Sequence, residues 1–176
     1  MRALDAARAA ALLFVAAILQ ASVFSDVRIL HGTPDLLLVS LVAVALLRGS
    51  IIGALAGFWA GLVFDTAVLG TLGVTSLLLV LTAYWVGRYG ETTGRDRTHA
   101  PFLAIAVVTF LYALGALFLH FMLGDPAPAR VVLVDTLFQT IGLNLLLTFP
   151  VYRFARLVLG IVPRAERVEG VSLLGQ

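Results

Sequence analysis

The chain of 176 residues is too apolar for an ordinary soluble domain, since hydrophobic residues make up 61%, charged residues 12%, and the mean hydropathy is +1.04. Cysteine is absent, which excludes disulfides, thiolate nucleophiles and sulfur metal ligands. The formal net charge of +2 is too small to indicate nucleic-acid binding, so we expect a membrane protein without a nucleic-acid partner.

Six apolar segments alternate with short polar breaks, which predicts an all-α polytopic membrane protein with six transmembrane helices. The segments are Ala9–Phe24, Pro34–Leu47, Ile51–Val68, Thr71–Gly87, Pro101–Leu123 and Val131–Phe149, the last with an apolar continuation to Val162. Pro150 should kink or end the sixth helix.

The second segment is the shortest, with only twelve apolar or small residues between Asp35 and Arg48. A run of that length is compatible with a re-entrant segment as well as with a span. We favour a span, because both flanking charges would then lie near the membrane interfaces. Arg48-Gly49-Ser50 would form a tight turn, and Arg48 would extend its guanidinium toward the headgroups.

The distribution of arginines predicts that both termini lie in the cytoplasm. With six spans, ten of the twelve arginines lie inside, and two, Arg28 and Arg130, lie outside. The ten are Arg2, Arg8, Arg48, Arg88, Arg95, Arg97, Arg153, Arg156, Arg164 and Arg167. Five spans would weaken this bias to six against six, so we expect a six-helix domain over residues 1–162 and a cytoplasmic tail over residues 163–176.

The first apolar segment has two possible interpretations. Arg2 and Arg8 precede an apolar core, as in a signal peptide, but no clear cleavage site follows beyond the weak Gln20-Ala21-Ser22. We therefore expect a retained first helix.

Small residues and one carboxyl repeat every four positions in the third segment: Gly49, Gly53, Gly57, Gly61 and Asp65. Residues at this spacing share one helix face, and in a membrane small residues allow another helix to approach closely. We expect this face to pack against a helix, either within the chain or in a partner. Asp65 comes at the C-terminal end of the helix, where the helix dipole disfavours an anion, so it needs a partner such as Arg130, Thr71, Thr75 or the amides of residues 70–73.

Several other polar residues fall near the outer ends of the predicted helices. Asp35 follows Pro34 and has the position of an N-terminal helix residue, and Asp135 lies in the first turns of the sixth segment. Gln139 adjoins a polar line formed by Thr136, Thr140, Asn144 and Thr148. Asp35, Asp135 and Gln139 are thus a candidate outer polar cluster, while hydrogen bonding between helices is the simpler alternative for the whole line.

No catalytic pattern is present, so we expect neither an enzyme nor a cofactor or metal site. His120 is the one histidine within a span, and Ser40 and Ser76 have no motif around them. The sequence before Asp65 lacks the Gly-x-Gly-Asp context of intramembrane aspartyl proteases, and no nucleotide-binding loop or His/Glu metal spacing occurs.

The middle of the chain resembles the rod shape-determining protein MreD family. The resemblance is carried by Pro34-Asp35-Leu36-Leu37-Leu38, Arg48-Gly49, the glycines at 53, 57 and 61, Asp65, and Leu72-Gly73. Ser50 and Thr71 stand where proline is common in such sequences. The similar stretch covers about residues 34–90, and the second half matches in hydropathy, in Asn144 and in Pro150.

The resemblance implies a non-enzymatic scaffold in the bacterial cytoplasmic (inner) membrane that serves cell-wall elongation. It implies an MreC-like protein as partner, with a RodA-type glycosyltransferase, a class B penicillin-binding protein and MreB as direct or indirect partners. It also implies a fold similar to the S-components of energy-coupling-factor transporters, which makes a vitamin-binding subunit the alternative. The short outer loops favour the scaffold, and Ala3, Ala7 and Ala11 give the first helix a small-residue face for a partner.

Overall fold

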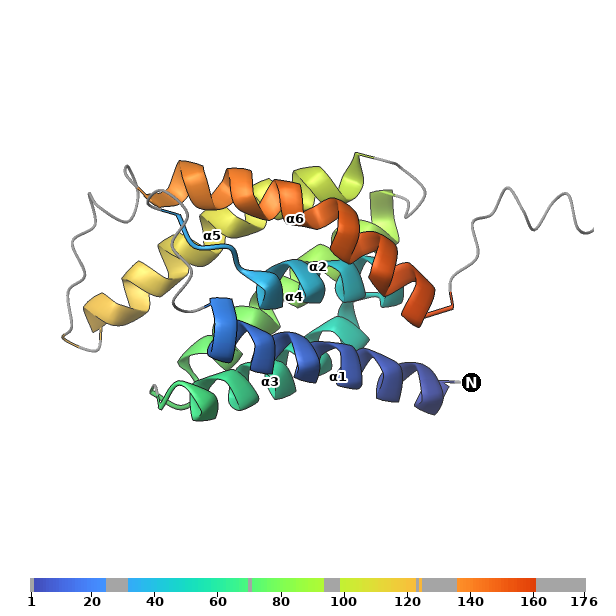
Figure 1. Ribbon diagram of the computed structural model, residues 1–176, viewed down its shortest axis with the longest axis horizontal. Helices are drawn as coiled ribbons and strands as arrows, with labels where there is room; N and C mark the ends of the chain where they lie inside the picture. The colour runs from blue at the N-terminus through green and yellow to red at the C-terminus, as the bar shows by residue number, and fades with distance from the viewer. Residues whose placement is uncertain are drawn as a thin grey trace, which may run out of the picture.

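The protein is described by a computed structural model that covers residues 2–24, 32–69, 71–93, 99–122, 124 and 136–160. These residues form six α-helices, which confirms the predicted all-α class (Figure 1). The helices are α1 (Arg2–Leu19), α2 (Leu36–Arg48), α3 (Ser50–Ala67), α4 (Val74–Thr93), α5 (Ala100–Met122) and α6 (Leu137–Val158), and a π-helical turn, η1 (Gln20–Phe24), extends α1.

The shortest helix, α2, occupies the centre of the bundle. Every residue from Leu37 to Leu47 is buried, because α1, α3, α4, α5 and α6 all pack around it. Figure 1 shows α2 enclosed between α1 and α3 on one side and α6 on the other. Its thirteen residues span only about 20 Å, less than the roughly 30 Å hydrocarbon core. Since the other helices, and not lipid, cover its sides, α2 does not need to match the thickness of the bilayer.

Within the described ranges, four helices are long and apolar enough to cross a membrane: Ala6–Val23 of the first segment, Ser50–Ala67, Ala100–Leu119 and Leu137–Val158. The protein is therefore polytopic. α2 is too short for this criterion, and α4 carries Arg88 and Glu91 near its end. The six-span topology thus stays a prediction, although consecutive helices run back and forth along one direction in Figure 1.

The start of α1 and the end of α6 lie at the same end of the molecule (Figure 1). The arginines whose side chains are described, Arg8, Arg48, Arg88, Arg153 and Arg156, belong to this end, since they start α1 or end α2, α4 and α6. The carboxyls of Asp35 and Asp65 belong to the opposite end. We refer to these as the arginine end and the aspartate end.

The sixth helix extends beyond Phe149 into the predicted apolar continuation, and residues 131–135 of the predicted segment lie outside the described residues. It begins at Leu137 and continues through Pro150 to Val158. An interior proline lacks the N–H of the helical hydrogen bond, which explains why α6 changes direction along its length in Figure 1. Residues 163–176, the predicted cytoplasmic tail, lie outside the described residues.

Candidate functional site

The glycine face of α3 packs against the backbone of α4. A Cβ at Gly61 would lie 2.4 Å from Ser76 Cα, and a Cβ at Gly57 would lie 2.9 Å from the carbonyl oxygen of Leu79. Real Cβ atoms essentially never approach other atoms below 3.0 Å. Glycine is therefore needed at these positions for the two helices to lie as close as they do.

The same close packing continues toward the arginine end, where α4 contributes glycines of its own. A Cβ at Gly53 would lie 2.8 Å from Ala45 Cβ of α2, and a Cβ at Gly87 would lie 2.4 Å from Ser50 Cα. Gly49 joins α2 to α3 with a φ of 94°, a left-handed conformation that glycine adopts without strain. The glycines of α3 thus face α4 and α2, while Ile51, Leu55 and Trp59 project outward.

Asp65 is 2% exposed and accepts a hydrogen bond through Oδ2 from the backbone N–H of Gly73, at 2.8 Å. This amide belongs to the turn between α3 and α4, one of the candidate partners named from the sequence. Gly73 has a φ of 93°, so the turn also requires glycine. The carboxyl therefore holds together the two helices that the glycines bring close.

Three side chains bind the N-terminus of α2, whose first amides have no partner within the helix. Asp35 caps its own helix by accepting from the Leu38 N–H at 2.9 Å. Gln20 of η1 accepts from the Leu36 N–H at 2.7 Å and donates to the carbonyl oxygen of Pro34 at 3.2 Å. Asn144 of α6 accepts from the Asp35 N–H at 2.8 Å.

Asn144 is the centre of a buried polar network that joins three helices. Its side chain is 0% exposed, and its Nδ2 donates to Thr109 Oγ1 of α5 at 3.1 Å. Thr148 donates to the carbonyl oxygen of Asn144 at 2.6 Å. The polar groups around Asn144 are thus satisfied by one another and by the backbone.

The sequence-predicted outer cluster is described in part. Gln139 lies beside Gly32, where an added Cβ would be 2.9 Å from Gln139 Cβ, so α6 runs along the segment that leads to Asp35. Asp135 and the side chain of His120 lie outside the described residues. Sequence reasoning missed Gln20 and Thr109 and treated Asn144 as one member of a polar line.

A second group of polar contacts closes the arginine end. Glu91 of α4 accepts from the Ser50 N–H at 2.8 Å and so caps α3, whose N-cap residue Gly49 has no side chain. The Ser50 amide, with help from the Ser50 hydroxyl and Arg88, holds the pKa of the Glu91 carboxyl below its usual value. Arg88 forms an ion pair with Glu91 at 3.3 Å. The sequence did not predict this cap, because Ser50 and Glu91 are 41 residues apart.

Arg48 does not simply extend to the headgroups as expected. It is half-buried, and its guanidinium donates to the carbonyl oxygen of Leu159 at the end of α6. The C-terminal carbonyls of a helix are an electronegative site, which suits a cation. Arg48 therefore fastens the end of α6 to the end of α2.

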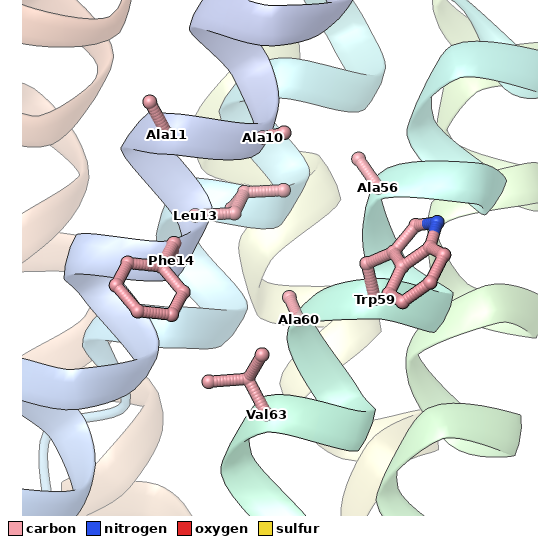
Figure 2. A pocket seen from close by; sticks show the side chains of 8 residues that line it. All are labelled: Ala10, Ala11, Leu13, Phe14, Ala56, Trp59, Ala60 and Val63. Atoms are coloured by element: carbon pink, nitrogen blue, oxygen red, sulfur yellow. The ribbon is translucent and has the colours of Figure 1, made fainter.

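An apolar groove with a volume of about 330 Å³ lies between α1 and α3 on the outside of the bundle (Figure 2). Ala10 and Ala11 of α1 and Ala56 and Ala60 of α3 supply small side chains to it, and Phe14 and Trp59 lie on its two sides. Ala7, one turn before Ala11, is also exposed. The side chain of Ala3 lies outside the described residues.

Within the described ranges, no three His, Cys, Asp or Glu side chains come together in a way that could hold a metal ion. The fold and these contacts define a class: a polytopic helical membrane protein whose buried polar groups bind one another and the helix ends. A sequence model of one family, described as rod shape-determining protein MreD, matches residues 2–158. The chain belongs to the MreD family and is thus a membrane protein of cell-shape determination.

No curated protein matches the chain, and no solved structure matches it either. The expected likeness to the S-components of energy-coupling-factor transporters therefore stays a prediction.

Proposed function

We propose that this protein is a non-enzymatic scaffold of the cell-wall elongation machinery in the bacterial cytoplasmic membrane, where it organises an MreC-like protein and peptidoglycan synthases. The observation that carries the proposal is the match of the MreD family model to residues 2–158, nearly the whole helical part of the chain. RodA-type glycosyltransferases, class B penicillin-binding proteins and MreB are further direct or indirect partners in this proposal.

The roles of the buried polar groups support a scaffold. Asp35 and Asp65 each accept a hydrogen bond from a backbone amide, at 2.9 Å and 2.8 Å. Asn144 and Gln20 are likewise used to bind backbone groups of the segment before α2. A scaffold needs a bundle that keeps its shape when partners bind, and buried, mutually satisfied polar groups specify one packing arrangement.

The charge distribution supports an orientation with both termini in the cytoplasm. The described arginines gather at one end of the bundle, and Asp35 and Asp65 lie at the other. Under the positive-inside rule the arginine end faces the cytoplasm, where its cations also lie close to anionic lipid headgroups.

Depletion in a rod-shaped bacterial host that encodes this protein tests the proposal. We expect the cells to become round, and we expect an MreC-like protein to co-purify with the tagged chain from gently solubilised membranes. Re-expression of the wild-type chain, or of an L146A variant with a change on the outward face of α6, should restore rod shape.

The vitamin-binding alternative makes the opposite prediction. If the purified chain binds a small water-soluble vitamin tightly and its depletion leaves cell shape unchanged, the scaffold proposal is wrong. Isothermal titration of the purified chain with a panel of such vitamins supplies the binding measurement.

A further inference from the structure

The end of α6 meets the start of α1 at the arginine end of the bundle (Figure 1). Gly160 lies just beyond α6 with a φ of 64°, and a Cβ added there would lie 3.6 Å from Arg8 Nη1 of α1. Arg153 and Arg156 precede this glycine at a spacing that places all three residues on one face of α6. We call this meeting point, formed by Arg8, Arg153, Arg156 and Gly160, the arginine junction.

Acidic side chains do not balance the charge of the arginine junction. Within the described ranges, none of its three arginines forms an ion pair, whereas Arg88 on α4 is paired with Glu91. The C-terminus of α6 carries a partial negative charge of roughly half an elementary charge. Arg48 already contacts this helix end through the carbonyl oxygen of Leu159. The junction therefore holds an excess of positive charge.

The depth of the arginine junction suits a phospholipid headgroup. Arg8 lies in the first turn of the candidate span Ala6–Val23, and Arg156 lies in the last turn of the span Leu137–Val158. Arg8 and Arg153 are exposed and Arg156 is half-buried, so a headgroup can reach these side chains. Arginines at the ends of membrane spans extend their guanidiniums to the level of the lipid phosphates. The membrane itself therefore brings an anion to this place.

We propose that the arginine junction binds the headgroup of an anionic phospholipid, with Arg8 of α1 and Arg156 of α6 donating hydrogen bonds to its phosphate oxygens. A guanidinium presents paired N–H donors that match the geometry of a phosphate. Basic sites between membrane helices on the cytoplasmic side bind such headgroups, including that of cardiolipin. A zwitterionic lipid brings its own cation and would leave the excess charge in place, so the headgroup must carry a net negative charge.

The bound lipid joins the first helix of the bundle to the last. This binding site goes beyond the proposed scaffold function and does not depend on it, because the site is a property of the purified chain.

Native mass spectrometry of the full chain tests the inference, because it counts the lipids bound to each molecule. The chain is purified in a mild detergent and titrated with cardiolipin, phosphatidylglycerol or phosphatidylethanolamine, all with the same acyl chains. We expect cardiolipin to bind most tightly and phosphatidylglycerol less tightly, and we expect no saturable binding of phosphatidylethanolamine.

Single substitutions ask whether the junction itself binds the lipid. R8Q and R156Q should each weaken cardiolipin binding about fivefold, the contribution expected of one basic side chain near an anionic headgroup. R88Q is the matched control, because it removes one positive charge from the same end of the bundle outside the junction, and it should leave binding nearly unchanged. The Tm of each variant without lipid reports any folding defect, and R153Q provides a further variant at an exposed side chain.

Three outcomes would overturn the proposal. The first is an equal loss of affinity in R8Q, R156Q and R88Q, which would show that only the total charge of this end matters. The second is equal binding of phosphatidylethanolamine and cardiolipin. The third is cardiolipin binding that is absent from the wild-type chain and present in the E166Q/E169Q variant, which would show that the predicted tail occupies the junction. The depletion experiment on cell shape is independent, so either proposal can fail while the other stands.

Discussion

The substitution G61A tests whether glycine sets the distance between α3 and α4. The added methyl group would lie 2.4 Å from Ser76 Cα and 2.6 Å from Ser76 N, both atoms of the α4 backbone. Ordinary contact begins at 3.4 Å, so α4 must move by about 1 Å, and a backbone cannot rotate away as a flexible side chain can. Overpacking of this kind costs about 1–3 kcal/mol.

An opposing effect reduces this cost. Alanine is a better helix former than glycine by roughly 0.5–1 kcal/mol, because glycine loses more backbone entropy on folding. We therefore expect a net destabilisation of roughly 0.5–2 kcal/mol. For a chain of this length each kcal/mol lowers the Tm by about 2–4 °C.

The control is G142A, on α6, where an added Cβ would meet nothing within 4 Å. This variant gains helix propensity without a clash, so its Tm should equal or exceed that of the wild type. The assay is thermal unfolding of the purified proteins in one detergent, followed by near-UV circular dichroism. If G61A proves as stable as G142A, the close approach of α3 and α4 does not depend on the missing side chain, and the packing argument fails.

Three further substitutions test the polar contacts and the topology. D65N keeps an oxygen for the Gly73 amide and should be mild, whereas D65L leaves that half-buried amide unpaired and should cost about 1–3 kcal/mol in the same assay. Equal stability of the two variants would contradict the anchoring role. E91Q should retain the cap on α3, and E91A should lose it. Because the pKa of Glu91 is lowered in the folded protein, the stabilising contribution of the Glu91 carboxylate is present at neutral pH and is lost as the pH falls below about 4.5. A wild-type Tm that does not approach that of E91Q in acid would count against the cap. G170C in this cysteine-free chain should resist an impermeant thiol reagent in intact cells and react after permeabilisation, and labelling of intact cells would overturn the cytoplasmic placement of the C-terminus.

The number of helices followed directly from the sequence, because hydrophobic segments and their polar breaks depend on composition within each segment. The four-residue spacing from Gly49 to Asp65 also marked one face of α3 for close packing, since that spacing places side chains together whatever surrounds the helix. The same local reasoning required a partner for Asp65 at the end of its helix. These are properties of single segments.

The tertiary structure decided which segments meet. The spacing of the glycines could not show that α4 and α2, and not another protein, lie against them, because the partner of a helix face depends on distant parts of the chain. Gln20 and Thr109 lie 14 or more residues from the groups they bind, so no local pattern linked them to the N-terminus of α2 or to Asn144. The sequence left open why α2 is short. The structure explains it, because five helices cover α2, and a helix surrounded by protein does not need to match the thickness of the bilayer.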